Sequence, residues 1–297
     1  MTAPRPSPVI LSIQSHVAYG YVGNRAAVFP LQNLGIEVIA VDTVQFSNHT
    51  GYGAWTGQVF DPAHLQDIID GLFARGAMDS VNAVLSGYLG SAALGTVIKQ
   101  TLEKLRNRNP DVIYCCDPVM GDTGRGFFVP QDIAQLFRDK MAGSATIVTP
   151  NQFELGYLTG RDIHTRADAL AACDDLHRRN IDTVLLTSME TVDTKPGTIE
   201  MLASGRKGRD RWQITTPKLP IDPAPNGAGD MTAALFTGHR INGKPVKSAL
   251  EHTASAVYSV FETTRIMGRR ELALIQSQKA LRRKTPLFKA EKVKDGT

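Results

Sequence analysis

The sequence predicts an α/β protein with a central, mostly parallel sheet, helices on both faces of that sheet and antiparallel strands at its edge. Three observations support this. Short apolar runs rich in Val, Ile and Leu recur along the chain, and continuous rather than alternating runs indicate strands that are covered on both faces. Their ends are separated by about 30 to 40 residues, the length of a strand–helix–strand unit. Helical patterns fill the gaps, so the order alternates as in doubly wound sheets.

The predicted strands are taken first. Six apolar runs form the parallel part of the sheet: Val9–Ile13, Ile36–Thr43, Ala83–Ser86, Val112–Cys116, Thr146–Thr149 and Thr183–Thr187. After Ser188 the pattern changes to two antiparallel strands, Thr198–Ala203 and Trp212–Thr216, which a basic loop joins. Such a pair commonly forms the edge of a mainly parallel sheet.

The predicted helices follow from apolar residues at helical spacing. They are Asn24–Leu34, His64–Arg75, Ala92–Arg108, Gln131–Met141, Thr165–Arg179, Gly229–Gly238, Val246–Thr263 and about Glu271–Leu281. Thr165 is a candidate N-cap for its helix. The chain shows no linker, repeat or low-complexity tract, so we expect one domain over residues 1–297, with a disordered arm at 1–8 and a flexible tail at 285–297.

Composition limits the classes of protein. The 297 residues are 42% hydrophobic and 21% charged, as in a globular protein with a full core. No apolar run reaches the roughly 20 residues that span a bilayer, and Met1–Pro8 lacks the apolar region of a secretory signal. The three cysteines fit neither a zinc spacing nor a disulfide framework. We therefore expect a cytoplasmic protein with buried thiols and no membrane partner.

The net charge of +4 is mild. Basic residues gather in Gly205–Arg211 and from Arg265 through Lys284, and such runs are usually solvated loops and helix faces. A nucleic-acid surface normally adds interleaved aromatic residues or a known motif, and neither cluster has them. No nucleic-acid partner is expected.

Polar and glycine-rich loops follow five of the predicted strands. They are Ser15–Asn24, Gln45–Gly53, Ser86–Gly90, Asp117–Gly126 and Thr149–Glu154. In an open parallel sheet, ligands bind outside the carboxyl ends of the strands. Five such loops at one edge predict a ligand site there.

The segment Pro225–Phe236 (PNGAGDMTAALF) carries the strongest chemical signal. Its glycines allow a tight turn with consecutive amide groups, and Asp230 then opens a helix of small residues. Unpaired amides at a helix N-terminus bind anions, and phosphoryl transfer also needs a carboxylate that orients and deprotonates the attacking hydroxyl. The plain alternative is a loop in which Asp230 only caps a helix. The chain lacks the P-loop, the dinucleotide-binding fingerprint and the protein-kinase signatures.

These residues carry a resemblance to a known family. Asn226–Asp230 followed by a small-residue helix resembles the anion-hole motif of the ribokinase-like superfamily. Ser12–Asn24 (SIQSHVAYGYVGN), Thr43–Gly53 (TVQFSNHTGYG), Cys116–Asp122 (CDPVMGD) and Thr149–Glu154, together with Ser86–Gly90, resemble the pyridoxal kinases specifically. The resemblance runs from about Val9 to Thr264 and implies ATP-dependent phosphorylation of the 5′-hydroxymethyl group of pyridoxal, and of pyridoxine and pyridoxamine.

The resemblance also implies roles for individual residues. Asp230 is expected to be the catalytic base, and the amides of Gly227, Ala228 and Gly229 the anion hole. The expected vitamer contacts, besides Asp230, are Ser15 at the pyridine nitrogen, Thr50 at the ring hydroxyl side, and the walls Val22, Phe46 and Tyr88. The expected ATP contacts are Asp122, Asn151, Glu154, Thr187, Ser188, Gly227 and Gly229. Asp117, Thr149 and Glu154 are expected to hold the metal.

Several of these residues have a simpler interpretation. Ser15 and Thr50 could be turn residues, and Asp117 could mark the end of a strand. Glu154 lies three residues after Asn151 at a helix start, which is also a capping pattern. Tyr19, Tyr21 and Trp55 are expected to pack, and His16 and His49 border the pocket without the spacing of a metal site, so neither is assigned a ligand role.

The resemblance implies Mg²⁺ with ATP as co-substrate, an activating monovalent cation such as K⁺, and a homodimer. Two positions depart from the family pattern: Ala228, where many relatives carry Thr or Val, and Phe128, where they carry Tyr. Compared with Thr and Tyr at these positions, Ala228 and Phe128 lack a hydroxyl near the phosphates or the nucleotide, which bears on catalytic efficiency.

Two other functions stay open. One is a related kinase that acts on the hydroxymethylpyrimidine of thiamine synthesis, although SHVAYGYVGN differs from the glycine-rich first loop of such enzymes. The other is a non-catalytic vitamer-binding protein, against which Asp230 and its glycines argue.

Overall fold

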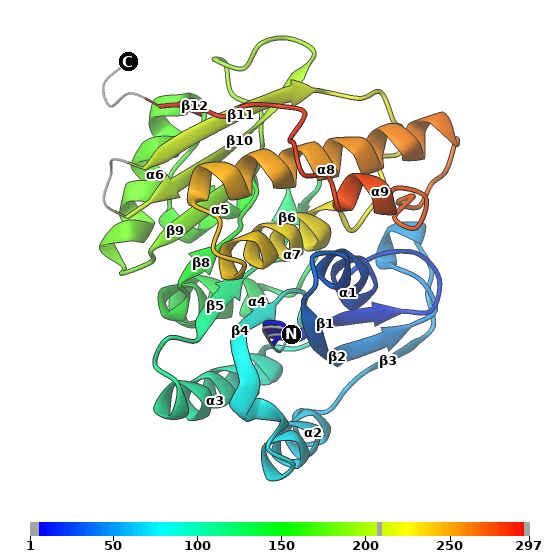
Figure 1. Cartoon of the computed structure of the whole chain (residues 1–297), viewed down its shortest axis with the longest axis vertical. Helices are drawn as coiled ribbons and strands as arrows, with labels where there is room; N and C mark the ends of the chain where they lie inside the picture. Colours follow the sequence, from blue (N-terminus) through cyan, green and yellow to red (C-terminus); the bar gives the residue numbers. More distant parts are fainter. Residues whose placement is uncertain (1–5, 207–209, 294–297) are drawn as a thin grey trace, which may run out of the picture.

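The computed structural model describes residues 6–206 and 210–293. One ten-stranded sheet runs through it in the order β12-β11-β10-β9-β8-β5-β4-β1-β2-β3 (Figure 1). Its six parallel strands are β1 (Val9–Val17), β2 (Glu37–Phe46), β4 (Val81–Ser86), β5 (Ile113–Cys116), β8 (Ile147–Val148) and β9 (Thr183–Met189). These are the six strands that the apolar runs predict, so the prediction of a mostly parallel sheet is confirmed.

Antiparallel strands lie at both edges of the sheet. The predicted pair is present as β10 (Thr198–Gly205) and β11 (Arg211–Pro217), which extend the sheet beyond β9. The sequence patterns missed β3 (Gly57–Val59), which pairs with β2, and β12 (Glu291–Lys292), which pairs with β11. Both are two or three residues long, too short for an alternation of apolar residues to be recognised.

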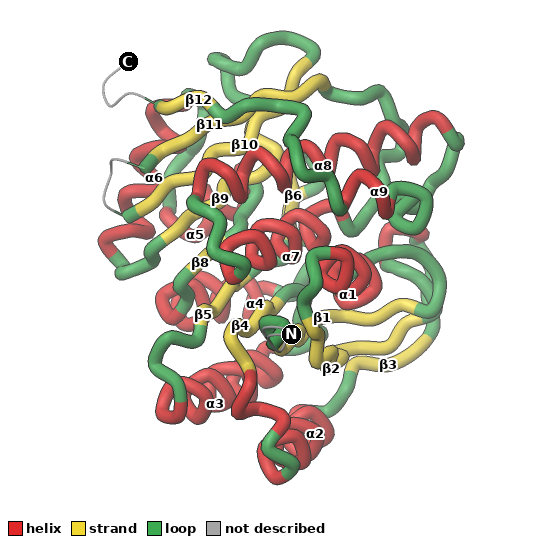
Figure 2. The backbone as a smooth tube through the Cα atoms, in the orientation of Figure 1, coloured by secondary structure: helices red, strands yellow, loops and turns green. Residues whose placement is uncertain are grey.

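Helices cover both faces of the sheet (Figure 2). One face carries α1 (Asn24–Asn33), α7 (Ala228–Ile241), α8 (Val246–Ile266) and the short α9 (Gln278–Leu281). The other carries α2 (Pro62–Ala74), α3 (Ala92–Arg108), α4 (Gln131–Leu136), α5 (Gln152–Thr159) and α6 (Arg166–Arg178). No helix of the described residues is long and apolar enough to cross a membrane.

Neighbouring residues of each central strand pack into different cores. Leu186 belongs to the core beneath α2–α6, and Leu185 to the core beneath α1, α7 and α8. Cys116 and Cys115 divide between the two cores in the same way. Because side chains alternate across a strand, a strand covered on both faces is apolar at most of its positions. All three cysteines are buried with free thiols, as expected, and burial raises the pKa of each.

The region around Glu271–Leu281 departs from the prediction of a helix. Only Gln278–Leu281 forms one, and Glu271, Leu272 and Leu274 are instead buried in a turning segment. The apolar spacing arises because these residues face the third core cluster, beside α7 and α8. The helix prediction is therefore wrong for 271–277.

The chain ends also differ from expectation. Residues 285–293 are packed rather than flexible: the Leu287 amide donates to Ser255 Oγ at 2.8 Å and the Ala290 amide to Glu251 Oε1 at 3.0 Å. Serine and glutamate side chains on α8 thus hold this segment, and Phe288 and Ala290 pack against the core beneath α1, α7 and α8. Residues 1–5 of the predicted arm and 294–297 of the predicted tail lie outside the described residues.

Candidate active site

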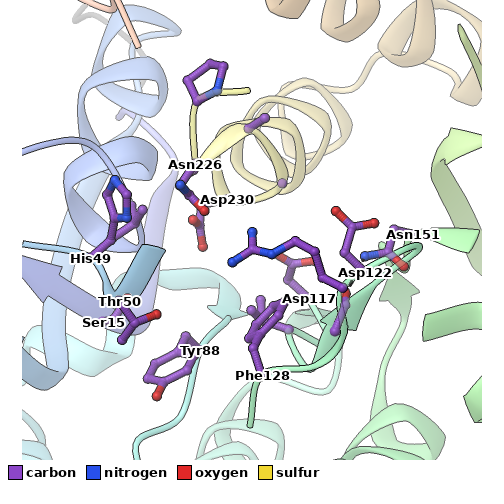
Figure 3. Close-up of a pocket in the computed structure, with 18 of the residues that line it drawn as sticks. Ser15, His49, Thr50, Tyr88, Asp117, Asp122, Phe128, Asn151, Asn226 and Asp230 are labelled. Carbon is purple, nitrogen blue, oxygen red and sulfur yellow. Dashed lines mark hydrogen bonds between the residues drawn. The ribbon is translucent and has the colours of Figure 1, made fainter. Parts of the chain in front are cut away.

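The loops after the parallel strands meet in a cavity of about 280 Å³. Each candidate residue of the sequence analysis lines it: Ser15, Val22, Phe46, Thr50, Tyr88, Asp117, Asp122, Thr149, Asn151, Glu154, Thr187, Ser188, Gly227, Ala228, Gly229 and Asp230. Figure 3 shows Ser15, His49 and Thr50 on one side, Asp122 and Asn151 on the other, and Asp230 between them. The cavity therefore has two halves that meet at Asp230.

The N-terminus of α7 faces this meeting point. Its N-cap, Gly227, has φ = 86°, and a Cβ there would lie 1.8 Å from the Tyr21 carbonyl oxygen. Only glycine fits that conformation and that contact. Within the described residues no side chain caps the helix, so its first amides keep their positive ends available to an anion.

Gly229 has a different reason to be glycine. Its φ is ordinary, and a Cβ there would meet no described atom within 4 Å. Neither backbone strain nor close packing requires glycine at this position. Gly229 does line the cavity, so a side chain here would occupy part of the cavity. Space is left over the first turn of α7 where a ligand can approach the backbone.

Two buried carboxyl groups line the cavity, and each has one oxygen atom without a hydrogen-bond partner among the described residues. Asp230 is 9% exposed and Asp117 is 3% exposed, and Asp230 Oδ1 and Asp117 Oδ2 have no hydrogen-bond partner among the described residues. Burial raises the pKa of Asp230, against the opposing effect of the Gly23 amide. Burial and then the Asp230 carboxylate raise the pKa of Asp117 to about 8. Unpartnered buried polar atoms are rare and mark functional sites.

Asp117 also has a fixed neighbour. Thr149 Oγ1 donates to Asp117 Oδ1 at 2.8 Å, which orients the carboxyl group and leaves Oδ2 free. A carboxylate oxygen beside a hydroxyl is the kind of donor set that Mg²⁺ takes, with phosphates and waters completing its shell. Among the described residues no cluster of three metal-ligating His, Cys, Asp or Glu side chains occurs.

The hydrogen bonds of Glu154 are those of a helix-capping residue. Its Oε2 accepts from the Asn151 amide at 2.9 Å, while Asn151 Oδ1 accepts from the Glu154 amide at 2.9 Å. Oε1 accepts from the Met120 amide at 3.0 Å. Glu154 therefore starts α5 and ties it to the chain that leads into a small hairpin, β6 (Gly121–Asp122) and β7 (Gly126–Phe127).

That hairpin forms the wall of one half. Asn151 Nδ2 donates to the Gly121 carbonyl oxygen at 2.8 Å, so the base of the hairpin is held from α5. Asp122 is exposed at its rim. Thr187 is buried beside Asn151 through a parallel bridge, and Ser188 follows it with φ = 50°.

The opposite half is apolar with a few polar groups. Phe46 and Ser15 are buried, Tyr88 and Val22 are half-buried, and Thr50 is exposed at the cavity wall. Such a lining suits a flat, partly polar ring. Of the aromatic residues expected to pack, Tyr19 and Trp55 are 62% and 47% exposed, and their ring centroids lie 6.2 Å from those of Tyr52 and Phe46 respectively.

Sequence reasoning assigned no role to the side chains of three polar residues that line the cavity: His49, Arg125 and Asn226. Arg125 is the only lysine or arginine among the described residues of the lining, against four carboxyl groups, and its guanidinium lies 5.7 Å from the ring centroid of Phe128. The motif Asp122–Gly126 contains this arginine, but only the hairpin turns it toward the cavity. His49 was noted at the border of the pocket and given no role.

Comparisons with known proteins agree with this geometry. A family model described as phosphomethylpyrimidine kinase matches residues 31–273. A pyridoxal kinase of Rubrobacter xylanophilus is 51% identical over 92% of this chain and 93% of its own length, and one of Deinococcus radiodurans is 48% identical over 96% of each. The structure of pyridoxal kinase from Leishmania donovani in complex with ADP and pyridoxamine superposes with a TM-score of 0.89 at 28% identity, covering 97% of this chain and 100% of that one.

Proposed function

This chain belongs to the pyridoxal kinase family, which has the ribokinase-like fold, and from that premise we propose how its own residues perform the reaction. The enzyme transfers the terminal phosphoryl group of ATP to the 5′-hydroxymethyl group of pyridoxal. The observation that carries the proposal is the buried, unpartnered Asp230 Oδ1 beside the uncapped N-terminus of α7. A base and an anion site lie where the two halves of the cavity meet.

Asp230 is the base in this proposal. It accepts the proton of the hydroxymethyl group as the oxygen attacks the terminal phosphorus atom, and the bond from that phosphorus to the bridging oxygen of ADP breaks. Its raised pKa brings its basicity closer to neutral pH, where general bases work best. The amides of Gly227, Ala228 and Gly229 stabilise charge on the transferring group without needing to reorganise.

The two halves divide the substrates. The vitamer binds in the mainly apolar half of the cavity, because its lining matches a substituted pyridine ring. The residues that bind it are Ser15, Thr50, Val22, Phe46 and Tyr88. ATP binds in the other half, on the side of the hairpin, where the residues that contact it are Asp122, Asn151, Thr187 and Ser188. We assign Glu154 to positioning that hairpin, because both of its oxygens accept backbone amides.

Arg125 supplies the missing positive charge. ATP brings about four negative charges into a cavity lined by four carboxyl groups, so a cation is needed near the phosphates. Arg125 is exposed on the hairpin, with its guanidinium 5.7 Å from the ring centroid of Phe128, and the planar guanidinium group carries five N–H donors that can bind phosphate oxygens.

Mg²⁺ fits the free Oδ2 of Asp117 and the hydroxyl of Thr149. When bound, it would neutralise phosphate charge and orient the terminal phosphoryl group. A monovalent cation such as K⁺, a homodimeric state and a cytoplasmic location are further parts of the proposal, and they rest on the family resemblance alone.

The choice of phosphoryl acceptor distinguishes this function from its two alternatives. We expect ADP release with pyridoxal, pyridoxine or pyridoxamine, and little with hydroxymethylpyrimidine, because the vitamer half matches pyridoxal kinases in SHVAYGYVGN. A coupled ADP assay with all four acceptors measures this. Preference for the pyrimidine would favour the thiamine-pathway kinase, and tight vitamer binding without ADP release would favour a binding protein.

The vitamer half can be tested by itself. Ser15→Ala and Thr50→Ala are each expected to raise the KM for pyridoxal between two- and tenfold, the effect of about 0.5–1.5 kcal/mol from one hydrogen bond. The KM for ATP should stay within twofold, because neither residue lies in the hairpin half. Steady-state kinetics with each substrate varied measures both values, and equal damage to the two would contradict the division of the cavity.

A further inference from the structure

Glu271 ties together three segments beside the vitamer half of the cavity. Its Oε2 accepts from the Tyr21 amide at 3.0 Å, and its Oε1 accepts from the Tyr52 hydroxyl at 2.7 Å and lies 3.0 Å from His49 Nε2. Glu271 and His49 are 3% and 6% exposed. Its neighbour Arg270 donates to the Gly51 carbonyl oxygen at 3.1 Å. A segment far along the chain thus holds the turn that carries Thr50.

The donors around Glu271 settle which nitrogen of His49 carries a hydrogen. Burial acts to raise the pKa of Glu271, but the hydrogen bonds from His49, Tyr52 and Tyr21 hold it below its ordinary value. Burial and the carboxylate also raise the pKa of Tyr52, so its hydroxyl remains a donor. An ionised carboxylate only accepts hydrogen bonds. The hydrogen therefore sits on Nε2 of His49.

The other ring nitrogen is left for a ligand. His49 lines the cavity, and its Nδ1 is buried with no hydrogen-bond partner in the described part of the chain. A neutral ring leaves only a lone pair unpaired at Nδ1, which is less costly than burying an unpaired charged N–H group. Nδ1 is then an acceptor without a donor.

The position of His49 relates it to one edge of the vitamer ring. His49 precedes Thr50, and a Cβ on Gly51 would lie 3.0 Å from His49 Nδ1 and 2.9 Å from Asn226 Nδ2. Figure 3 shows His49 facing Asn226, with Asp230 just beyond it. With the ring nitrogen at Ser15 and the C5 hydroxymethyl group at Asp230, the C3–C4 edge of the ring falls on the side of Thr50 and His49.

We propose that Glu271 is a positioning residue that holds His49 in the Nε2–H tautomer, so that Nδ1 accepts a hydrogen bond from a donor on the C3–C4 edge of the vitamer. This rests on the proposed function. The donor is the 3-hydroxyl group, which all vitamers share, or an O–H or N–H group on the C4 substituent. In either case His49 contributes to vitamer recognition and takes no part in the proton transfer to Asp230 or in phosphoryl transfer.

The substitution Glu271→Gln reverses the tautomer in this scheme. The amide oxygen must face the Tyr21 amide, which can only donate, so the new NH₂ group faces His49 Nε2 and Tyr52. The Tyr52 hydroxyl can accept from it, and Nε2 must accept as well. The hydrogen moves to Nδ1, which turns from acceptor to donor. Glu103→Gln, an exposed change on α3, is the matched control.

The tautomer can be measured in the ligand-free protein. Long-range ¹H–¹⁵N spectra of histidine-labelled protein distinguish protonated from unprotonated ring nitrogens, and His49→Asn assigns the signals among the seven histidines. We expect an unprotonated Nδ1 in the wild type and in Glu103→Gln, and a protonated Nδ1 in Glu271→Gln. A protonated Nδ1 in the wild type overturns the proposal. This measurement needs no turnover, so its failure is distinguishable from failure of the proposed function.

Kinetics locate the donor. His49→Phe is expected to lower kcat/KM for the vitamer about two- to tenfold with KM for ATP unchanged, whereas His49→Asn, which keeps a polar atom near the place of Nδ1, retains most of it. An equal loss with pyridoxine, 4-deoxypyridoxine and pyridoxal identifies the 3-hydroxyl group, and a loss with pyridoxine alone identifies the C4 substituent. Unchanged kcat/KM in a folded His49→Phe protein, or an equal loss toward ATP, overturns the proposal.

Discussion

Asp230→Asn is expected to lower kcat roughly 10²–10⁴-fold, the usual contribution of a positioned general base. The amide cannot take the proton of the attacking hydroxyl, although it fills the same space. Folding should not suffer. Because burial raises the pKa of Asp230, the charged form is disfavoured in the folded state and stability is lost as pH rises above the unfolded pKa. A neutral asparagine should leave the melting temperature unchanged or higher.

The measurement is steady-state kinetics with thermal unfolding of the same preparations. Asp67→Asn, an exposed change on α2, is the matched control and should behave as wild type. The wild type should also lose kcat at acid pH along a limb that lies above the range of an ordinary aspartate, since the base must be ionised. A rate for Asp230→Asn within a few-fold of wild type would show that Asp230 is not the base.

Arg125→Ala is expected to lower kcat about 10²-fold, with a smaller rise in KM for ATP and no change in KM for pyridoxal. The reason is charge: without Arg125 the described lining of the cavity holds four carboxyl groups and no arginine or lysine. Losing one preorganised donor to a transferring group typically costs 10²–10³-fold in kcat. Kinetics with ATP and pyridoxal varied separately measures the three values.

Two further variants separate charge from hairpin structure. Arg125→Lys keeps the charge without the planar fork and should recover part of the rate, and added guanidinium ion should partly rescue Arg125→Ala. Thr123→Ala in the same hairpin should stay near wild type, because Thr123 is not among the residues that line the cavity. A full rate in Arg125→Ala would place the guanidinium outside the reaction, and a loss shared by Thr123→Ala would point to hairpin disorder.

Much of the fold could be predicted from local patterns. Strands β4, β5 and β9 are covered on both faces, so most of their residues are apolar and their runs are visible in the sequence. The helix at Glu271–Leu281 failed because apolar spacing reports only that residues face a core. It does not report whether the backbone between them is helical, and here the Ala273 amide donates to Thr264 Oγ1 at 2.9 Å, a tertiary rather than a helical hydrogen bond.

The residues of the candidate site also fall into two groups, those that local sequence motifs predict and those that only the fold places. Residues of long local motifs, such as Asp117 and Asp230, could be chosen from the sequence because a strand end or a helix start places each of them. Glu154 could be given two interpretations, and only the hydrogen bonds from the Met120 and Asn151 amides favour capping. Arg125 and His49 carried no distinguishing local signal.

The sequence by itself determined the parallel sheet, the edge of the sheet at which the cavity lies and the glycine turn at Gly227–Asp230, because burial pattern and backbone conformation are properties of neighbouring residues. Only the tertiary structure decided which atoms are left without partners. Whether Asp230 Oδ1, Asp117 Oδ2 and His49 Nδ1 are satisfied depends on every segment that folds against them, including one more than 200 residues away in the case of His49. Which buried atoms lack a hydrogen-bond partner depends on how the whole chain packs. In this protein these three atoms belong to residues that line the cavity.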